Sequence, residues 1–227
     1  MVKKVLVLGA GRSVTSLILS LNQLAIDHEL EVTLADQEYE LTVKKSQSLS
    51  HVSPLSFKTD DEELLIRTIS THDVVISMLP PSAHLKIAIQ CIRLKKHLIT
   101  ASYLSEKLRS YDQKAKDAGI LILMEAGLDP GIDHMSAMKE LNEIRSMGGK
   151  ITSFKSYTGG VIAPESDDNP WHYKITWNPK NVVMAGREGA RFISNGQYKF
   201  IPYHSVFSRL DKVFIPEYGE YLSLIHI

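Results

Sequence analysis

The stretch GLDPGIDHM, residues 127–135, gathers the side chains that are most able to move protons. Asp129 and Asp133 offer carboxylates, and His134 offers an imidazole that titrates near neutral pH. The stretch follows the apolar run ILILME, which predicts a buried strand, so Asp129 comes just after that strand ends. Two roles stay open for Asp129 at this point, and the first is that of an acid or base. The alternative is a helix start, with Asp129 as the N-cap and the other two as ordinary first-turn residues.

The elements that must position these groups are predicted by the first half of the chain. Short apolar runs alternate there with longer mixed segments, which is typical of strand and helix units around a parallel sheet. Together they predict an α/β fold, a doubly wound parallel (Rossmann) sheet. Strands are expected at residues 4–8, 31–35, 54–57, 74–78, 98–101 and 120–124, and helices at 13–24, 38–49, 61–69, 83–94 and 105–117.

A glycine loop follows the first predicted strand. In GAGRSV, Gly9 and Gly11 match the first two glycines of a dinucleotide-binding fingerprint, and Val14 stands in place of the third. Because the third glycine serves packing of the helix on the strand, Val14 predicts a slightly displaced helix and a retained phosphate site. We expect the loop and the helix start, including Arg12 and Ser13, to bind a diphosphate.

Two further segments are expected to meet this nucleotide. Asp36 ends the second predicted strand, where an acid commonly bonds the adenine ribose hydroxyls and repels a 2′-phosphate. We therefore expect NAD as the cofactor, with NADP less favoured; the alternative is that Asp36 caps the helix beginning at Glu38. Leu79 and Pro80 are expected beside the dinucleotide, although a rigid turn with Ser82 as a helix cap explains that segment equally well.

After residue 126 the pattern changes to that of an α+β segment. We expect residues 1–126 to form the dinucleotide-binding domain and residues 127–227 to form part of a substrate domain. Trp171, Tyr173 and Trp177 alternate and are expected to lie in its core. Its elements are expected to be a helix at 131–147, strands at 150–160 and 172–177, a helix near 182–187 and a hairpin turning at Asn195-Gly196.

Composition narrows the class of protein. The chain has 227 residues, 44% of them hydrophobic, and equal numbers of acidic and basic residues without a basic run, which argues against a nucleic-acid partner. It has no apolar run long enough to span a membrane. The single cysteine, Cys91, predicts a reducing, cytoplasmic compartment. No histidine and carboxylate spacing predicts a metal site. We expect a small-molecule partner, with a homodimer as an open possibility.

Two long motifs in the second half carry a family resemblance. GLDPGIDHM and SYTGGVIAPESDDNPWHYKITWNP, following the GAG loop and the segment TASYLS, resemble the saccharopine dehydrogenase family in its L-glutamate-forming, or saccharopine-reductase, branch. The resemblance runs from Val5 to about Tyr221. It implies a pyridine-nucleotide oxidoreductase of lysine metabolism. Hydride would pass between the nicotinamide and the carbon bearing a secondary amine, and hydrolysis of the imine would give L-glutamate and 2-aminoadipate 6-semialdehyde.

The resemblance also implies site residues. Tyr103, Asp129 and Thr158 match positions where the family has its substrate and acid–base residues. Thr158 is a departure, because some relatives carry cysteine there; its hydroxyl is suited to hydrogen-bonding substrate. His134 is a secondary candidate, with a structural role on a helix surface as its alternative. Tyr103 has the alternative of packing beneath the loop.

Members of that family are longer and carry, beyond this point, an Asn-Arg-Asp-Ser segment whose arginine binds a substrate carboxylate. The ending LSLIHI does not resemble the family's continuation, so we expect a C-terminally truncated substrate domain. Two other functions stay open. One is a related reductive-condensation enzyme such as a carboxynorspermidine dehydrogenase, whose diamine substrate calls for acidic recognition groups. The other is an inactive nucleotide-binding fragment.

Overall fold

The computed structural model describes residues 2–160, 162–175, 189–206, 208–216 and 218–224. The chain divides into two compact units, Met1–Ser136 and Ala137–Ile227. The division falls within helix α7 (Ile132–Ser146). The boundary after residue 126 expected from the sequence stays a prediction.

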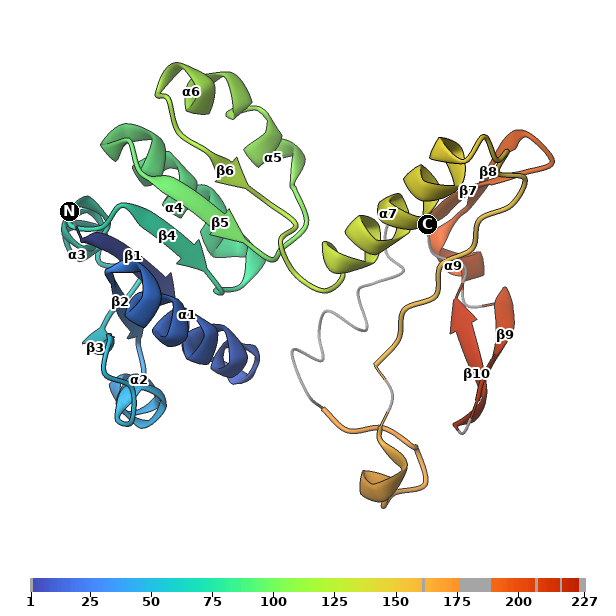
Figure 1. The fold of residues 1–227 in the computed structure, drawn as a ribbon, viewed down its shortest axis with the longest axis horizontal. Helices are drawn as coiled ribbons and strands as arrows, with labels where there is room; N and C mark the ends of the chain where they lie inside the picture. Colours follow the sequence, from blue (N-terminus) through green and yellow to red (C-terminus); the bar gives the residue numbers. More distant parts are fainter. Residues whose placement is uncertain (1, 161, 176–188, 207, 217, 225–227) are drawn as a thin grey trace. The chain divides into compact units, whose positions relative to one another are not determined.

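The first unit is built around a six-stranded parallel sheet with the strand order β3-β2-β1-β4-β5-β6 (Figure 1). The order reverses between β1 and β4, so the chain winds outward in both directions from the centre, as a doubly wound sheet does. The predicted Rossmann sheet is therefore confirmed. Its strands are β1 (Lys3–Leu8), β2 (Leu30–Asp36), β3 (Val52–Ser56), β4 (Val74–Ser77), β5 (His97–Thr100) and β6 (Ile122–Leu123).

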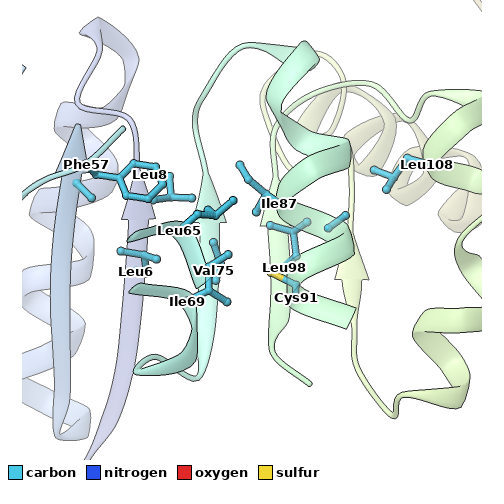
Figure 2. Close-up of a cluster of buried hydrophobic side chains, with 12 residues drawn as sticks. Leu6, Leu8, Phe57, Leu65, Ile69, Val75, Ile87, Cys91, Leu98 and Leu108 are labelled. Carbon is cyan, nitrogen blue, oxygen red and sulfur yellow. The ribbon is translucent and has the colours of Figure 1, made fainter. Parts of the chain in front are cut away.

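Helices cover both faces of this sheet, which is why its strands read as continuous apolar runs. Along β1, Val5 and Val7 pack in one core cluster, and Leu6 and Leu8 pack in the other. Figure 2 shows the second cluster, where Leu6 and Leu8 lie beside Leu65 of α3 (Glu62–Ser70), and α4 (Pro81–Leu94) adds further side chains to the cluster. The first cluster is covered by α1 (Thr15–His28) and α2 (Tyr39–Ser46), and the second by α3 (Glu62–Ser70), α4 (Pro81–Leu94) and α5 (Glu106–Arg109).

One predicted helix of this unit is interrupted. The segment 105–117 forms two short helices, α5 and α6 (Asp112–Asp117). At the break, the Ser110 hydroxyl donates to the Lys107 carbonyl at 2.8 Å, and the Tyr111 N–H bonds the Leu108 carbonyl three residues back. A serine that bonds a nearby carbonyl competes with the regular helical pattern, so the helix ends there.

The second unit contains the rest of α7, a short helix α9 (Tyr203–Val206) and two antiparallel hairpins, β7–β8 (Ala190–Ser194, Gln197–Ile201) and β9–β10 (Leu210–Ile215, Gly219–Leu224). The hairpin predicted at Asn195-Gly196 is confirmed. Both turn residues have positive φ, 52° and 73°, as a two-residue turn between twisted strands requires.

Other predictions for this unit were wrong. Residues 150–160 and the described part of the 172–177 segment contain no strand. Trp171 is 80% exposed and Tyr173 is 39% exposed, so neither lies in a core. Alternation alone does not bury a side chain when the segment has no partner strand. Trp177 and the helix expected near 182–187 lie outside the described residues.

In the parts of the chain that the structure describes, no helix is long and apolar enough to cross a membrane. Within the same residues, no group of three or more metal-binding side chains comes together.

Candidate functional site

The loop after β1 is shaped around Gly9. Its N–H donates to the Ala35 carbonyl of β2 at 2.8 Å, and its φ of +105° is one that other residues rarely adopt. A Cβ built on Gly9 would lie 3.1 Å from the carbonyl carbon and oxygen of Met78. The loop therefore passes directly against the backbone that follows β4, and this position requires glycine.

Gly11 has a different environment. A Cβ built there would meet no atom within 4 Å, so the space beside it is open. Gly11 precedes a 3-10 turn (Arg12–Val14), in which Arg12 and Ser13 are exposed, and α1 begins after this turn at Thr15. Val14 is fully buried in the core against the sheet. The chain thus has Val14 in place of the third glycine of the fingerprint, and its helix begins only at Thr15. The backbone at Gly11 stays accessible.

Asp36 is bound into this loop. Its Oδ2 accepts the Ala10 N–H at 2.6 Å, and its Oδ1 accepts the Glu38 N–H at 2.9 Å. The carboxylate therefore ties the glycine loop to the end of β2 and to the start of the next helical segment. Both of its oxygens accept backbone N–H groups, so Asp36 alone is no evidence of a binding site for ribose hydroxyls.

Leu79 and Pro80 lie in the connection between β4 and α4. The Leu79 side chain packs against the core and approaches the position of a Cβ on Gly9 to 3.4 Å. Pro80 is the N-cap residue of α4, with Pro81 as the first helical residue, so Ser82 is not the cap. This segment accordingly borders the glycine loop.

Two of the candidate site residues are in direct contact at the carboxyl edge of β5 and β6. The Tyr103 hydroxyl donates to Asp129 Oδ1 at 2.7 Å. Tyr103 is 63% exposed, so the pair is open to a small molecule. Partial burial, the hydrogen bond and the neighbouring carboxylates together raise the pKa of Tyr103, which keeps the phenol protonated as a donor.

The backbone that carries Asp129 is tightly folded. The Gly127 N–H bonds the Pro130 carbonyl at 2.9 Å, and the Ile132 N–H bonds the Gly127 carbonyl at 3.0 Å. Gly131 has φ +148°, and a Cβ there would overlap the Gly127 carbonyl oxygen. The peptide bond between Asp129 and Pro130 is cis. This compact turn presents Asp129 to Tyr103.

His134 belongs to a separate pair. Its Nδ1 lies 2.7 Å from Asp133 Oδ1, which also accepts the Gly131 N–H at 2.8 Å. The Asp133 hydrogen bond raises the pKa of His134. Burial of Asp133 opposes ionisation, but its bonds to His134 and Gly131 outweigh that and lower its pKa. His134 thus bonds Asp133 in the first turn of α7, and no direct bond joins it to Asp129 among the described contacts.

Several supporting residues were not singled out from the sequence. Glu125 has φ +60°, and its Oε1 accepts the Leu104 N–H at 2.9 Å, which joins the Tyr103 loop to the segment leading to Asp129. His84 lies beneath that loop and bonds the Ser102 hydroxyl at 2.8 Å. A lone histidine in a helix and a lone glutamate after a strand have no spacing pattern that would have indicated these roles.

Thr158 lies in the second unit, whereas Tyr103, Asp129 and His134 lie in the first. It is exposed, in a segment without regular secondary structure. The neighbouring Tyr157 hydroxyl donates to Asp211 Oδ2 at 2.9 Å, and Lys155 Nζ lies 3.5 Å from the same oxygen. These contacts attach the segment before Thr158 to β9.

Comparison with known proteins agrees with the geometry of the first unit. The model of the saccharopine dehydrogenase NADP-binding domain matches residues 5–123, and that of the saccharopine dehydrogenase C-terminal domain matches residues 127–226. The chain belongs to the saccharopine dehydrogenase family.

Relatives and a solved structure support this assignment. The NADP(+)-dependent, L-glutamate-forming saccharopine dehydrogenase of Pyricularia oryzae is 42% identical over 86% of this chain and 42% of its own length. The α-aminoadipic semialdehyde synthase of Arabidopsis thaliana is 47% identical over 66% of this chain and 14% of its own. Apo saccharopine dehydrogenase (L-Glu forming) from Saccharomyces cerevisiae superposes with a TM-score of 0.84 at 32% identity, over 98% of this chain and 49% of that chain. The chain therefore spans less than half the length of these relatives.

The comparisons correct the expected cofactor. The matching family model is an NADP-binding domain, and the fungal saccharopine dehydrogenases of Pyricularia oryzae and Saccharomyces cerevisiae are named for NADP(+). These findings favour NADP, so the expectation of NAD was wrong. That expectation took Asp36 as a partner of the ribose, whereas both oxygens of Asp36 accept backbone N–H groups of the loop and of Glu38.

Proposed function

We propose that this chain carries the nucleotide-binding part and part of the substrate site of an NADP-dependent, L-glutamate-forming saccharopine dehydrogenase. The reaction would interconvert saccharopine with L-glutamate and 2-aminoadipate 6-semialdehyde. The observation that supports the proposal most directly is the Tyr103–Asp129 hydrogen bond at the carboxyl edge of the sheet, where doubly wound folds bind substrate. The family membership supports the choice of substrate.

The residues of the glycine loop fit a dinucleotide diphosphate. The open space at Gly11 and the exposed 3-10 turn leave backbone amides accessible at the start of a helix, where they attract anions. Gly9, Leu79 and Pro80 would shape the wall between this loop and β4. Bound NADP would supply the acceptor or donor of the hydride.

In the proposed mechanism, Asp129 accepts or donates the proton of the secondary amine, or the proton of the water that adds to the imine. This role requires that the carboxylate reach the reacting atoms from a rigid backbone. The compact turn around Gly131 provides that rigidity. Tyr103, held protonated, orients Asp129 and can donate to substrate. His134 would have a lesser role, and Thr158 is retained as a candidate for hydrogen-bonding substrate.

Two further proposals accompany this function. The first is that the domain boundary lies after residue 126, between the two segments that the family models match. The second is a reducing compartment such as the cytoplasm, which the single cysteine of the chain, Cys91, supports because disulfides are rare there. Both stand independently of the catalytic roles.

The function is tested by two measurements on the chain. Fluorescence titration with NADPH and NADH should show tighter binding of NADPH. Incubation with saccharopine and NADP⁺ should produce NADPH together with L-glutamate, while carboxynorspermidine should give no NADPH. Turnover of carboxynorspermidine in place of saccharopine would overturn the substrate assignment, and NADPH binding without turnover would reduce the function to nucleotide binding.

A further inference from the structure

A buried histidine that the proposed reaction does not use lies close beneath the site. His84, in α4, is 3% exposed. Its Nδ1 lies 3.1 Å from the Ser77 hydroxyl, and its Nε2 lies 2.8 Å from the Ser102 hydroxyl and 3.2 Å from the Thr100 hydroxyl. One imidazole therefore joins the end of β4, the end of β5 and the loop that follows β5.

Two partners of His84 adjoin both the loop with Tyr103 and the segment that leads to Asp129. Ser102 directly precedes Tyr103, and its carbonyl accepts the Glu125 N–H at 3.1 Å. The Thr100 carbonyl accepts the Ala126 N–H at 3.0 Å. The loop with Tyr103 and the segment that leads to Asp129 are thus fastened to each other at the residues that His84 holds.

The same ring also reaches toward the glycine loop. Ser77 is followed by Met78, whose N–H donates to the Leu8 carbonyl at 2.8 Å. The Met78 carbonyl is the group that a Cβ on Gly9 would meet. His84 accordingly lies between the backbone that borders the nucleotide loop and the backbone that carries Tyr103.

The chemistry of imidazole suits this place. Burial lowers the pKa of His84, so the ring is neutral and has one N–H donor and one acceptor nitrogen, pointing in different directions. A hydroxyl group can donate or accept a hydrogen bond, so each of the three hydroxyls can match the donor or acceptor role of the nitrogen that it faces. A shorter side chain or an apolar one would leave buried hydroxyls without their partner, which is costly.

We propose that His84 is a positioning residue that fixes the loop 100–104, so that the Tyr103 hydroxyl meets Asp129. This inference rests on the proposed function for its effect on turnover. Its effect on the Tyr103–Asp129 hydrogen bond does not depend on what the enzyme converts, and it can be measured without substrate.

The test uses NMR of the whole chain labelled with ¹³C at the tyrosine Cζ atoms, a signal that responds to hydrogen bonding of the phenol. Tyr103→Phe identifies the Tyr103 signal, and Asp129→Ala gives its position without the hydrogen bond. In His84→Gln the Tyr103 signal should move toward its position in Asp129→Ala. If a folded His84→Gln protein kept the signal of the unaltered chain, the proposal would be overturned.

The matched control is His72→Gln. His72 is also buried, at 7% exposure, and its ring bonds the Thr68 carbonyl at 2.7 Å and the Thr33 and Thr71 hydroxyls at 2.9 and 3.1 Å. It lies just before β4, at the opposite edge of the sheet from Tyr103. The Tyr103 signal should not move in His72→Gln; an equal movement in both variants would show a general loosening and overturn the proposal.

Two further measurements complete the test. If His84→Gln does not fold, Ser102→Ala, which removes the shortest bond to the ring, decides by the same signal. In saccharopine oxidation, His84→Gln should lower kcat about tenfold to a hundredfold, as small misplacements of catalytic groups do, with NADPH affinity unchanged. Unchanged kcat would overturn the proposal, whereas an unaltered chain without turnover would contradict only the proposed function, because the Tyr103 signal would still decide.

Discussion

Asp129 precedes a Pro-Gly pair at the start of a helix, where an aspartate either caps the helix or carries a proton. The N–H groups at the start of α7 and just before it have other partners: Gly131 bonds the Asp133 carboxylate, Ile132 bonds the Gly127 carbonyl, and Asp133 bonds the Leu128 carbonyl. Asp129 instead accepts the Tyr103 hydroxyl. This arrangement favours a proton-handling role over a capping role.

Replacing Asp129 with Asn separates the two roles. Asparagine caps helices about as well as aspartate and has the same shape, so a capping role predicts little change. If Asp129 handles a proton, we expect turnover of saccharopine to fall by about a hundredfold to ten-thousandfold, which is the usual contribution of general acid–base catalysis. Melting temperature and NADPH affinity should change little.

His134→Gln is the control for this prediction. Because His134 bonds Asp133 and not Asp129, its replacement should cost much less turnover. An Asp129→Asn protein that kept most of its activity, or a larger loss in His134→Gln, would contradict the assignment and leave Tyr103 as the better candidate.

The sequence indicated some site residues better than others. Asp129 stands in a long motif and Tyr103 in the segment TASYLS, and the resemblance covers both, so both could be named in advance. The partner of Asp36 could not, because the Ala10 N–H that it accepts is distant in sequence and is brought to it only by pairing of β1 with β2. His84 was missed for the same reason: its three hydroxyl partners come from two strand ends and a loop that meet only in the fold.

Among the elements, the strand and helix units of the first unit were predictable because each strand is buried on both faces and each helix has one apolar face. Most of the second unit was not. Its described core cluster contains only Ala190, Ile201 and Val206, with Phe192 packed against it. Because so few positions are buried, the alternation of apolar and polar residues does not predict the strands of this unit. Only the Asn195-Gly196 turn had a clear sequence signal.

The glycine loop offers a prediction about an element, made with one substitution at two positions. Gly9→Val should destabilise the fold by about 1–3 kcal/mol or more, because valine is strained at φ +105° and its Cβ would press on the Met78 carbonyl. Gly11→Val should leave the free energy of unfolding within about 0.5 kcal/mol, because φ is −61° and the space is open.

Binding should separate the same two variants further. The side chain of Gly11→Val would occupy the space proposed for the diphosphate, and loss of one hydrogen bond to a charged group weakens NADPH binding by roughly tenfold or more. Urea unfolding followed by circular dichroism and NADPH fluorescence titration would measure both effects. Normal NADPH affinity in Gly11→Val would mean that the nucleotide binds elsewhere.

For the molecule as a whole, the two buried histidines of the first unit predict a response to acid. Burial lowers the pKa of both His84 and His72 below the ordinary value of 6.5, and for His72 the bond to the Thr68 carbonyl only partly offsets this. The unfolded chain therefore binds protons at a pH where the folded chain does not. The stability linked to each histidine is fully present above pH 6.5 and is lost as the pH falls below it.

Other titrating groups should not obscure this response. The exposed His134–Asp133 pair has the opposite sign: its stabilisation is present below the unfolded pKa of His134 and is lost as the pH rises through the raised folded value. It contributes little because exposed ion pairs are weak. The carboxylates of Asp73 and Asp133 have pKa values below 3.8, so they stay ionised down to pH 5.

We therefore expect the free energy of unfolding to fall between pH 6.5 and pH 5, with a slope of at most about 1.4 kcal/mol per pH unit for each buried histidine. Urea unfolding followed by circular dichroism at several pH values would measure the slope. His72→Gln and His84→Gln should each be less stable at pH 8 and should each show a shallower slope, because one protonation site is removed while its bonds are partly lost. A free energy of unfolding that stays constant from pH 8 to pH 5 in the unaltered chain would mean that these rings can be protonated inside the folded structure. The proposal that a neutral His84 ring bridges the three hydroxyls and positions Tyr103 would then have to be abandoned.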